Sequence, residues 1–374
     1  MPSNSAPLVA IVLPPREGFG PGRTGAVGLI VQRLAAVPGF RTVVVGGPQA
    51  GTTFADIAFR EARAPFWRPG NANVRHASGV ARLVRDLRPA LIEVHNRPET
   101  ALALARWLPE ARVVLFLHND PQTMRQAGSA AERTALLHRM ARVVTVSDYL
   151  RGRLMAGVFA PAPPPAVLPN CIDLAALLAV GAAIGPRAQE ILFVGRVVPE
   201  KAPDAFVAAC AAALPKLPGW RAAIIGADRF RADSPDTPFV RRVKAEAEAA
   251  GVRMLGYQDH PEVLAALART AIVVVPSRWQ EPFGLTALEA MASGAALIAS
   301  PRGGLPEVAG DAALYADPDD PQTIAAAMLA LATDRTRRDA LAAAARQRAK
   351  RFDLDPTLQR LAALRADLMA GAGG

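Results

Sequence analysis

The sequence predicts an α/β protein that consists of two parallel-sheet domains in tandem. Its 374 residues are too many for one ordinary hydrophobic core. Short apolar segments recur along the chain, and each is followed by a turn and a helical pattern, which is typical of a doubly wound sheet. A proline cluster at residues 159–173 interrupts this alternation, and we expect a linker there.

The first half contains five segments that we expect to be strands. Apolar runs of this length suit parallel strands that are covered on both faces. They occupy residues 8–13, 41–47, 90–95, 112–118 and 142–147. Helical patterns between them cover residues 25–36, 74–87 and 99–108.

The second half repeats this pattern and ends in a basic helical segment from about residue 334. Its predicted strands occupy residues 190–195, 221–226, 252–256, 271–277, 295–300 and 312–316. We therefore predict two Rossmann-like domains, residues 1–165 and 166–350, that face each other across a cleft. A helical tail, residues 351–374, is expected to pack back on the first domain. Ligands of such sheets bind beyond the carboxyl ends of the strands, so polar residues directly after each strand are site candidates.

Composition narrows the class of protein. Hydrophobic residues make up 51% of the chain, and the net charge of +10 favours contact with a nucleotide, an acidic glycan or a membrane surface. Cys171 and Cys210 are too few for a disulfide framework and lack metal-ligand spacing, so we expect buried thiols in a reducing compartment. No basic leader precedes the first apolar segment, and no segment reaches the roughly 20 apolar residues of a membrane span. The expected location is the cytoplasm.

The first candidate segment, LFVGRVVPEKAPDAF, contains a lysine in a chain that otherwise prefers arginine. Only four of the 43 lysines and arginines are lysines. Gly195 and Arg196 directly follow a predicted strand, and Lys201 precedes a predicted helix. Two cations on one loop can hold a diphosphate, arginine through its planar fork and lysine as a point charge. A solvated basic turn explains the same loop equally well when it is considered alone.

The second candidate segment is VVVPSRWQEPFGLTALEAMASG. It places Phe283, Gly284 and Leu285 at the start of a short helix, whose free N–H groups suit anionic or hydroxyl-rich ligands. Glu281 lies before this helix and Glu289 about one turn inside it, where carboxylates could grip sugar hydroxyls. Apolar neighbours surround Glu289, so we expect it to be buried and to have a partner.

Together these two segments resemble those of the GT-B glycosyltransferases of family GT4. The resemblance lies in Gly-Arg with Glu-Lys downstream, then Glu-Pro-Phe-Gly-Leu and a second glutamate eight residues after the first. It covers nearly the whole chain and implies a retaining hexosyltransferase that needs no metal or other cofactor. Its co-substrate would be a nucleotide-diphosphate sugar, a UDP- or GDP-sugar. One departure is Ala202, because the family usually has glycine after the lysine.

The resemblance also implies a role for each candidate residue of the second half. Arg196 and Lys201 would bind the donor diphosphate. The donor sugar would be held by Glu281 together with the backbone of Phe283, Gly284 and Leu285. Glu289 would take the ribose hydroxyls. The reaction barrier lies in breaking the anomeric C–O bond while negative charge grows on the diphosphate. Cations and helix N-termini stabilise this charge.

The first half offers candidates for the other side of the site. A glycine-rich loop, PPREGFGPGRTGAVG, leads into a helix near Gly25, but it matches neither a dinucleotide fingerprint nor a P-loop. In similar enzymes this loop closes over the diphosphate. Two predicted strands end in similar signatures, VHNRP and LHNDP. By resemblance His118 would touch the donor sugar and act with Glu281 in catalysis, while His95 and Asn96 would shape the acceptor side.

The acceptor is expected to be a glycan or a lipid-linked glycan of cell-surface polysaccharide, lipopolysaccharide or glycolipid assembly. Clustered arginines could bind an anionic membrane peripherally at the inner face of the plasma membrane, although a solvated face explains them as well. They are Arg82, Arg85, Arg88, Arg133, Arg139, Arg142, Arg151 and Arg153.

Three other functions fit parts of the sequence. A non-hydrolysing sugar-nucleotide 2-epimerase shares the fold but should carry acid/base carboxylates and histidines on several loops, and this chain has five histidines in all. A non-catalytic sugar-nucleotide-binding protein would need the same binding residues. Nucleic-acid binding would explain the charge, but no basic motif with interleaved aromatic residues is present, so no nucleic-acid partner is expected.

Overall fold

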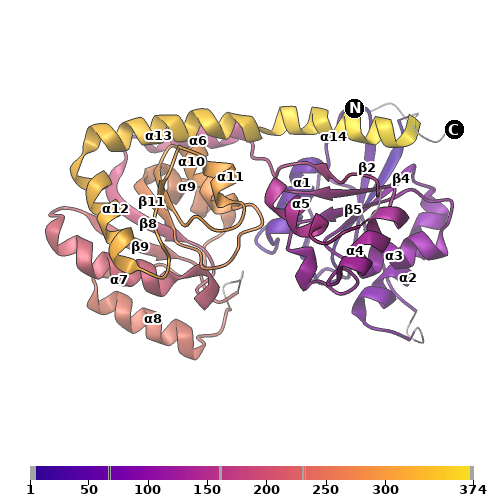
Figure 1. Ribbon diagram of the computed structural model, residues 1–374, viewed down its shortest axis with the longest axis horizontal. Helices are drawn as coiled ribbons and strands as arrows, with labels where there is room; N and C mark the ends of the chain where they lie inside the picture. Colours follow the sequence, from indigo (N-terminus) through magenta and orange to yellow (C-terminus); the bar gives the residue numbers. More distant parts are fainter. Residues whose placement is uncertain are drawn as a thin grey trace. The chain divides into compact units, whose positions relative to one another are not determined.

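The computed structural model describes residues 6–65, 67, 69–159, 162–229, 231 and 233–370. The chain divides into two compact units (Figure 1). Unit 1 comprises Met1–Cys171 together with Leu354–Gly374, and unit 2 comprises Ile172–Asp353. The first segment of unit 1, unit 2 and the second segment of unit 1 therefore follow one another along the chain.

Unit 1 contains a seven-stranded parallel sheet in the order β3-β2-β1-β4-β5-β6-β7. The strands are β1 (Leu8–Val12), β2 (Arg41–Gly46), β3 (Phe59–Glu61), β4 (Leu91–His95), β5 (Val113–Leu117), β6 (Arg142–Thr145) and β7 (Ala166–Val167). In the centre of the sheet, Ala10 of β1 lies between Val43 of β2 and Ile92 of β4. Strands β1, β4 and β5 are thus neighbours although they are far apart in sequence.

Helices cover both faces of this sheet. They are α1 (Ala26–Leu34), α2 (Ala72–Leu87), α3 (Pro98–Trp107), α4 (Ala130–Arg139), α5 (Asp148–Met155) and α14 (Leu354–Ala370), with a 3-10 turn η1 (Pro121–Thr123). Polar side chains cap the N-termini of several of these helices, because they accept hydrogen bonds from backbone N–H groups that have no partner within the helix. Asn71 caps α2, Ser129 forms a capping box with Glu132 at α4, and Ser147 caps α5.

Helix α14 joins unit 1 through a fully buried ion pair. Arg365 donates from Nε and Nη2 to the two carboxylate oxygens of Glu93 on β4, at 2.8 and 2.7 Å. Arg365 is 0% exposed and Glu93 is 2% exposed. The other face of β4, with Ile92 and Val94, packs in the core against α2 and α3. Among the described residues, the cation that pairs with Glu93 therefore comes from a segment that follows unit 2 in sequence.

Unit 2 contains a six-stranded parallel sheet in the order β10-β9-β8-β11-β12-β13. The strands are β8 (Ala188–Val194), β9 (Arg221–Ile225), β10 (Val252–Met254), β11 (Thr270–Val275), β12 (Ala296–Ala299) and β13 (Leu314–Tyr315). Strands β8 and β11 pair directly, with Leu192 opposite Val273. The loops that leave their carboxyl ends therefore start side by side.

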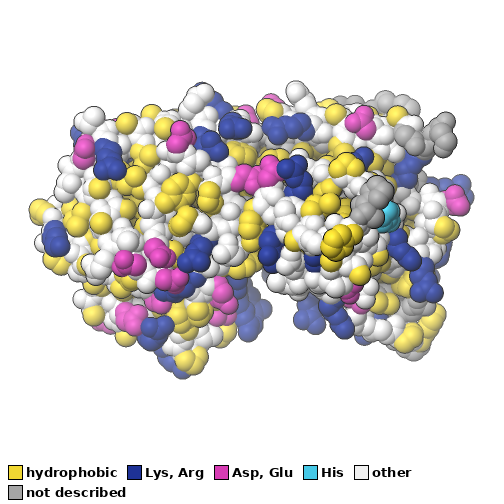
Figure 2. Space-filling model, in the orientation of Figure 1, with side chains coloured by type: hydrophobic (Ala, Val, Ile, Leu, Met, Phe, Trp, Pro, Cys, Tyr) yellow, Lys and Arg dark blue, Asp and Glu magenta, His cyan; other side chains and the backbone are white. Residues whose placement is uncertain are grey.

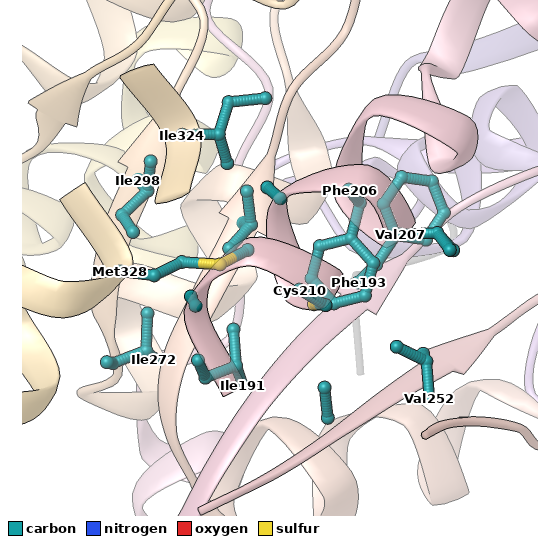
Figure 3. Packing of buried hydrophobic residues seen from close by; sticks show 14 of the residues in the cluster. Ile191, Phe193, Phe206, Val207, Cys210, Val252, Ile272, Ile298, Ile324 and Met328 are labelled. Atoms are coloured by element: carbon teal, nitrogen blue, oxygen red, sulfur yellow. The ribbon is translucent and has the colours of Figure 1, made fainter. Parts of the chain in front are cut away.

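The helices of unit 2 lie around this sheet. They are α6 (Leu174–Ile184), α7 (Pro203–Ala213), α8 (Pro238–Ala249), α9 (His260–Arg269), α10 (Leu285–Ser293), α11 (Leu305–Ala309), α12 (Pro321–Thr333) and α13 (Arg335–Ala349), with 3-10 turns η2 (Pro199–Lys201), η3 (Leu214–Lys216) and η4 (Lys350–Phe352). Figure 3 shows side chains of α7 and α12, such as Phe206 and Met328, packed with those of the strands. Cys210 belongs to this core, and Cys171 is buried in unit 1.

The structure confirms the strands and helices that the sequence predicted, with boundaries that differ by a few residues. Two short edge strands were missed, β3 and β7. The expected linker at residues 159–173 is wrong in its second part, because β7 lies there and pairs with β6. The unit borders follow Cys171 and Asp353, whereas the predicted domain borders follow residues 165 and 350.

Candidate functional site

The loop after β8 places Arg196 and Lys201 at the carboxyl edge of the unit 2 sheet. Arg196 follows the strand after Gly195, and Lys201 ends the turn η2. Ala202 then adopts left-handed backbone angles, with φ of 54° and ψ of 44°. This conformation is free for glycine but costs alanine about 1–2 kcal/mol, which gives a physical reason for the glycine that the resemblance leads us to expect here. Ala202 adopts this turn here, with Lys201 directly before it.

Lys201 and Glu281 form an ion pair within unit 2. Lys201 Nζ lies 2.5 Å from Glu281 Oε1, and it also lies 4.8 Å from the centroid of the Trp279 ring. Glu281 is 6% exposed, so its carboxylate needs this cation. The carbonyl of Glu200 accepts hydrogen bonds from the N–H groups of Arg278 and Trp279, at 2.9 and 3.0 Å. The loops after β8 and β11 are thus fixed to each other.

Helix α10 begins where the second candidate segment predicted. Gly284 is its N-cap and has φ of 104°, a left-handed value that disfavours other residues. A Cβ at Gly284 would also lie 2.5 Å from Leu305 Cδ2. Phe283 is buried, and Leu285 is the first helical residue. The positive end of this helix therefore lies directly after Glu281 in sequence, which favours negatively charged or hydroxyl-bearing ligands near it.

Glu289 is buried on α10, as predicted, and its partner is a residue that the sequence did not single out. Glu289 is 7% exposed, and its Oε1 lies 2.9 Å from His260 Nε2 at the start of α9. The residues on both sides of it, Leu288 and Ala290, are fully buried. The segment YQDHPEV marks a helix start through its capping box, but nothing in it indicates that His260 faces Glu289.

In unit 1, a carboxylate lies at the N-terminus of α1. Glu17 Oε1 accepts a hydrogen bond of 3.0 Å from the N–H of Gly28. Burial raises the pKa of Glu17, while the hydrogen bond from Gly28 opposes this shift. A Cβ at Gly25 would lie 2.7 Å from Glu17 Oε1, so glycine leaves room for this side chain. A diphosphate at Gly25 would therefore have to replace Glu17 at the helix end.

His95 and His118, which end adjacent strands, meet inside unit 1. His95 Nδ1 lies 2.9 Å from His118 Nε2, and the His95 ring also stacks on Phe116 at 4.7 Å between centroids. His95 is 1% exposed and His118 is 8% exposed. Burial lowers the pKa of His118 to about 4 and that of His95 well below its usual value, with nearby His118 and Arg365 adding to the effect on His95. Both rings are therefore neutral near pH 7, and one donates to the other.

Asn96 organises the loop that carries His118. It has φ of 58°, and its Oδ1 accepts from the N–H groups of His118 and Asn119, at 3.2 and 3.1 Å. Asn tolerates this left-handed backbone better than most residues. The structure therefore brings His95, Asn96 and His118 together at the carboxyl ends of β4 and β5.

The arginine cluster is not a uniform surface. Arg133 is 4% exposed and donates to the carbonyls of Leu154, Ala127, Gly128 and Ala156, so its assignment to a membrane-facing cluster is wrong. Arg82, Arg85 and Arg88 on α2 and its C-cap are exposed. On the face shown in Figure 2, lysine and arginine side chains are dispersed among hydrophobic and acidic ones.

Comparison with protein families decides the identity of these two units. Residues 182–348 match the family model "Glycosyl transferases group 1", and residues 27–176 match the model "Glycosyltransferase Family 4". The chain belongs to the GT4-type glycosyltransferases of GT-B fold. The resemblance drawn from the sequence is thereby confirmed.

Curated relatives are similar to part of the chain. The D-inositol 3-phosphate glycosyltransferase of Segniliparus rotundus is 34% identical over 196 residues, 50% of this chain and 42% of the relative. The lipopolysaccharide core biosynthesis mannosyltransferase LpsB of Rhizobium meliloti is 32% identical over 182 residues, 47% of this chain and 50% of the relative. The chain thus spans about half the length of these GT4-type relatives.

Solved structures of GT-B fold are similar over nearly all of the chain. The structure of Anabaena HepE in complex with UDP and glucose has a TM-score of 0.74 at 18% identity, and the match covers 96% of this chain and 99% of HepE. Sucrose-phosphate synthase from Thermosynechococcus elongatus has a TM-score of 0.77 at 20% identity, over 98% of this chain and all of the synthase chain, 100%. The predicted GT-B fold class is therefore confirmed.

No described helix is long and apolar enough to cross a bilayer. No group of three or more histidine, cysteine, aspartate or glutamate side chains is placed to hold a metal ion in the part of the chain that the structure describes.

Proposed function

We propose that this chain is a retaining hexosyltransferase that moves a sugar from a nucleotide-diphosphate sugar to an acceptor hydroxyl. The observation that carries the proposal is the Lys201–Glu281 pair at the carboxyl edge of the unit 2 sheet. It joins a cation suited to phosphate and a carboxylate suited to sugar hydroxyls on two loops that are fixed to each other. In a bound donor, a phosphate oxygen would contact Lys201 and a sugar hydroxyl would donate a hydrogen bond to Glu281.

The proposed chemistry needs charge stabilisation more than proton transfer. Bond breaking at the anomeric carbon leaves negative charge on the diphosphate, which Arg196, Lys201 and the α10 N-terminus would stabilise. Glu281 and the backbone of Phe283, Gly284 and Leu285 would hold the sugar, and Glu289 the ribose. His118 would contact the transferred sugar as a neutral ring, consistent with its lowered pKa. The loop at Gly25 would add a diphosphate contact once Glu17 leaves the helix end.

The acceptor side of the proposal is a glycan or lipid-linked glycan of surface polysaccharide or lipopolysaccharide assembly. The similarity to LpsB supports this class of pathway, and the UDP and glucose named with HepE support a UDP-sugar donor, with a GDP-sugar as the alternative. We propose a cytoplasmic enzyme, and the exposed arginines of α2 could hold it at an anionic membrane surface. No nucleic-acid partner is proposed.

A thermal-shift screen of UDP-, GDP- and ADP-sugars tests donor binding. The correct donor at saturating concentration should raise the melting temperature by several degrees, because it binds only the folded chain. The variant Lys201→Ala should lose most of the shift. Turnover assays with the donor that binds then separate an enzyme from a binding protein, and NMR of the product shows whether the anomeric configuration is retained.

Metal removal tests the charge-stabilising role assigned to Arg196 and Lys201. If these side chains and the helix N-terminus supply the positive charge, EDTA should leave the transfer rate unchanged. A rate that falls in EDTA and returns with Mn²⁺ or Mg²⁺ would contradict the proposed metal-independent chemistry.

A further inference from the structure

Unit 1 contains a pocket of about 390 Å³. Residues that follow β1, β4 and β5 line it together with Ala72 and Asn73 of α2, and these three strands are neighbours in the sheet. The polar side chains of the lining that matter here are Arg16, Asn73, Asn96, Arg97, Glu99 and Arg125. The carboxyl ends of three adjacent strands thus deliver three guanidinium groups to one concave surface, the place where parallel sheets bind their ligands.

The three arginines reach the pocket from three separate loops. Arg16 and Arg125 are exposed, and neither forms an ion pair with any residue that the structure describes. Arg97 is half-buried and donates from Nη1 to the carbonyl of Asn96, at 2.7 Å. Because no carboxylate of the described residues pairs with Arg16 or Arg125, both guanidinium groups keep hydrogen-bond donors for a ligand.

One carboxylate lies in the lining, and it already has donors of its own. Glu99 Oε1 accepts from Asn71 Nδ2 at 2.6 Å, and Oε2 accepts from Asn73 Nδ2 at 3.0 Å. Both oxygens are thus directed toward the start of α2. With three cations and this one anion, the lining has a net charge of two positive units.

The pocket is joined to the candidate catalytic histidine through Asn96. Asn96 lines the pocket, while its Oδ1 accepts from the backbone N–H of His118. We propose that this pocket binds an anionic group, a phosphate or a carboxylate, on the sugar acceptor, which is thereby held beside the His118 loop. The guanidinium fork matches both groups bidentately. This inference rests on the proposed transferase function, because it names the chemical class of the acceptor.

The test is calorimetric titration of the full chain with glucose 6-phosphate, glucuronate and glucose at one ionic strength. The chain is first saturated with UDP, or with the nucleotide diphosphate that the thermal-shift screen identifies, so that the donor site is filled. An anionic sugar should bind at least about tenfold more tightly than glucose, because charge-assisted hydrogen bonds are the stronger ones. The glucose 6-phosphate and glucuronate arms show whether phosphate or carboxylate is preferred. Equal affinity for all three sugars would overturn the proposal.

Three variants with the same change in charge test whether the anionic sugar binds in this pocket. Arg125→Gln and Arg16→Gln should each weaken glucose 6-phosphate or glucuronate binding by about tenfold, as expected for the loss of one charged partner. Arg106→Gln is the matched control, because Arg106 is exposed in the last turn of α3 while the pocket lies at the first turn of that helix. Equal losses in all three variants would indicate general charge attraction and overturn the assignment to this pocket.

The design keeps this inference apart from the proposed function. If no nucleotide sugar binds the chain, the transferase proposal fails, and the anion titration is run on the Lys201→Ala variant, whose diphosphate loop is disabled. Selective loss of anion binding in Arg125→Gln would then still support the pocket. If nucleotide binds but the wild-type chain binds anionic sugars no more tightly than glucose, the transferase proposal stands and the proposed acceptor class is wrong.

Discussion

At the scale of single residues, the scarce lysine has a structural reason. The ammonium of Lys201 is a compact point charge that lies against both Glu281 and the Trp279 ring. A guanidinium, the usual cation of this chain, is planar and spreads its charge over a wide fork, so it would not reproduce the compact contact of the ammonium with both neighbours. The geometry therefore favours lysine at this one position.

Replacement of Lys201 tests this view. Lys201→Ala should lower turnover by about 10²-fold or more through loss of a charge-stabilising group. Lys201→Arg should also be impaired, because a fork is not a point charge. Steady-state kinetics and nucleotide titration measure both effects. Wild-type nucleotide affinity in both variants would refute the diphosphate assignment, whereas Arg335→Ala, at a highly exposed position of unit 2, should change nothing.

The buried histidines predict a pH-dependent stability. The pKa of His118 is about 4 in the folded chain and near 6.5 when unfolded, so the unfolded chain binds the extra proton. Stability should therefore be complete above about pH 6.5 and fall as the pH decreases toward 4. Between pH 7.5 and pH 5, His118 should account for a loss on the order of 1–2 kcal/mol in the free energy of unfolding. His76 and His95, whose pKa values burial also lowers, act in the same direction.

Urea unfolding at pH 7.5 and at pH 5 measures this dependence. His118→Gln, which cannot titrate, should show a smaller difference between the two pH values than the wild type. The exposed His138→Gln variant should keep the wild-type difference. An unchanged difference in His118→Gln would mean that His118 is protonated equally in both states.

At the scale of elements, the sequence revealed the long buried strands and missed the short edge ones. Segments such as residues 113–117 are apolar throughout, and this pattern alone predicts a buried strand. Strand β7 has two residues, within a proline-rich segment, and exists because β6 offers it an edge to pair with. Pairing of this kind depends on the finished sheet, and no local pattern encodes it.

Helix α14 provides a prediction at this scale. Arg365→Met should destabilise unit 1 by about 3–5 kcal/mol, because it leaves the buried carboxylate of Glu93 without its partner. The double variant Glu93→Leu/Arg365→Met should recover most of this loss, since no unpaired charge remains. Arg360→Met, at an exposed position of the same helix, is the control. Denaturant unfolding compares the four chains, and a double variant as unstable as Arg365→Met would contradict the charge argument.

At the scale of the whole molecule, each unit has its own hydrophobic core. One core gathers residues of β8, β11, α7 and α12, and the other gathers residues of β1, β4, α2 and α3. Arg365→Met should therefore increase hydrogen exchange in β4 and β5 and leave β8 and β11 protected. Mass-spectrometric exchange resolves the two regions. Equal loss of protection in both cores would mean that the units open as one.

The candidate residues could be predicted one at a time, but their partners could not. The sequence indicated that Glu289 is buried and that His95 and His118 each end a predicted strand. The contacts of Glu289 with His260, of His95 with His118 and of Arg365 with Glu93 join segments 29, 23 and 272 residues apart. Such pairs follow from how the sheets and helices assemble. The pocket could not be predicted for the same reason, because its arginines come from three loops that are far apart in sequence.

The buried pair between Glu93 and Arg365 also sets the order in which the chain can mature. A ribosome makes Glu93 early, then the whole of unit 2, and only afterwards the helix that carries Arg365. Throughout that interval the nascent β4 holds a carboxylate whose cation has not yet been made. Unit 2, which is continuous in sequence, can complete its own sheet before the unit that begins the chain. Of these two units, the one whose translation starts earlier is the last that can be finished.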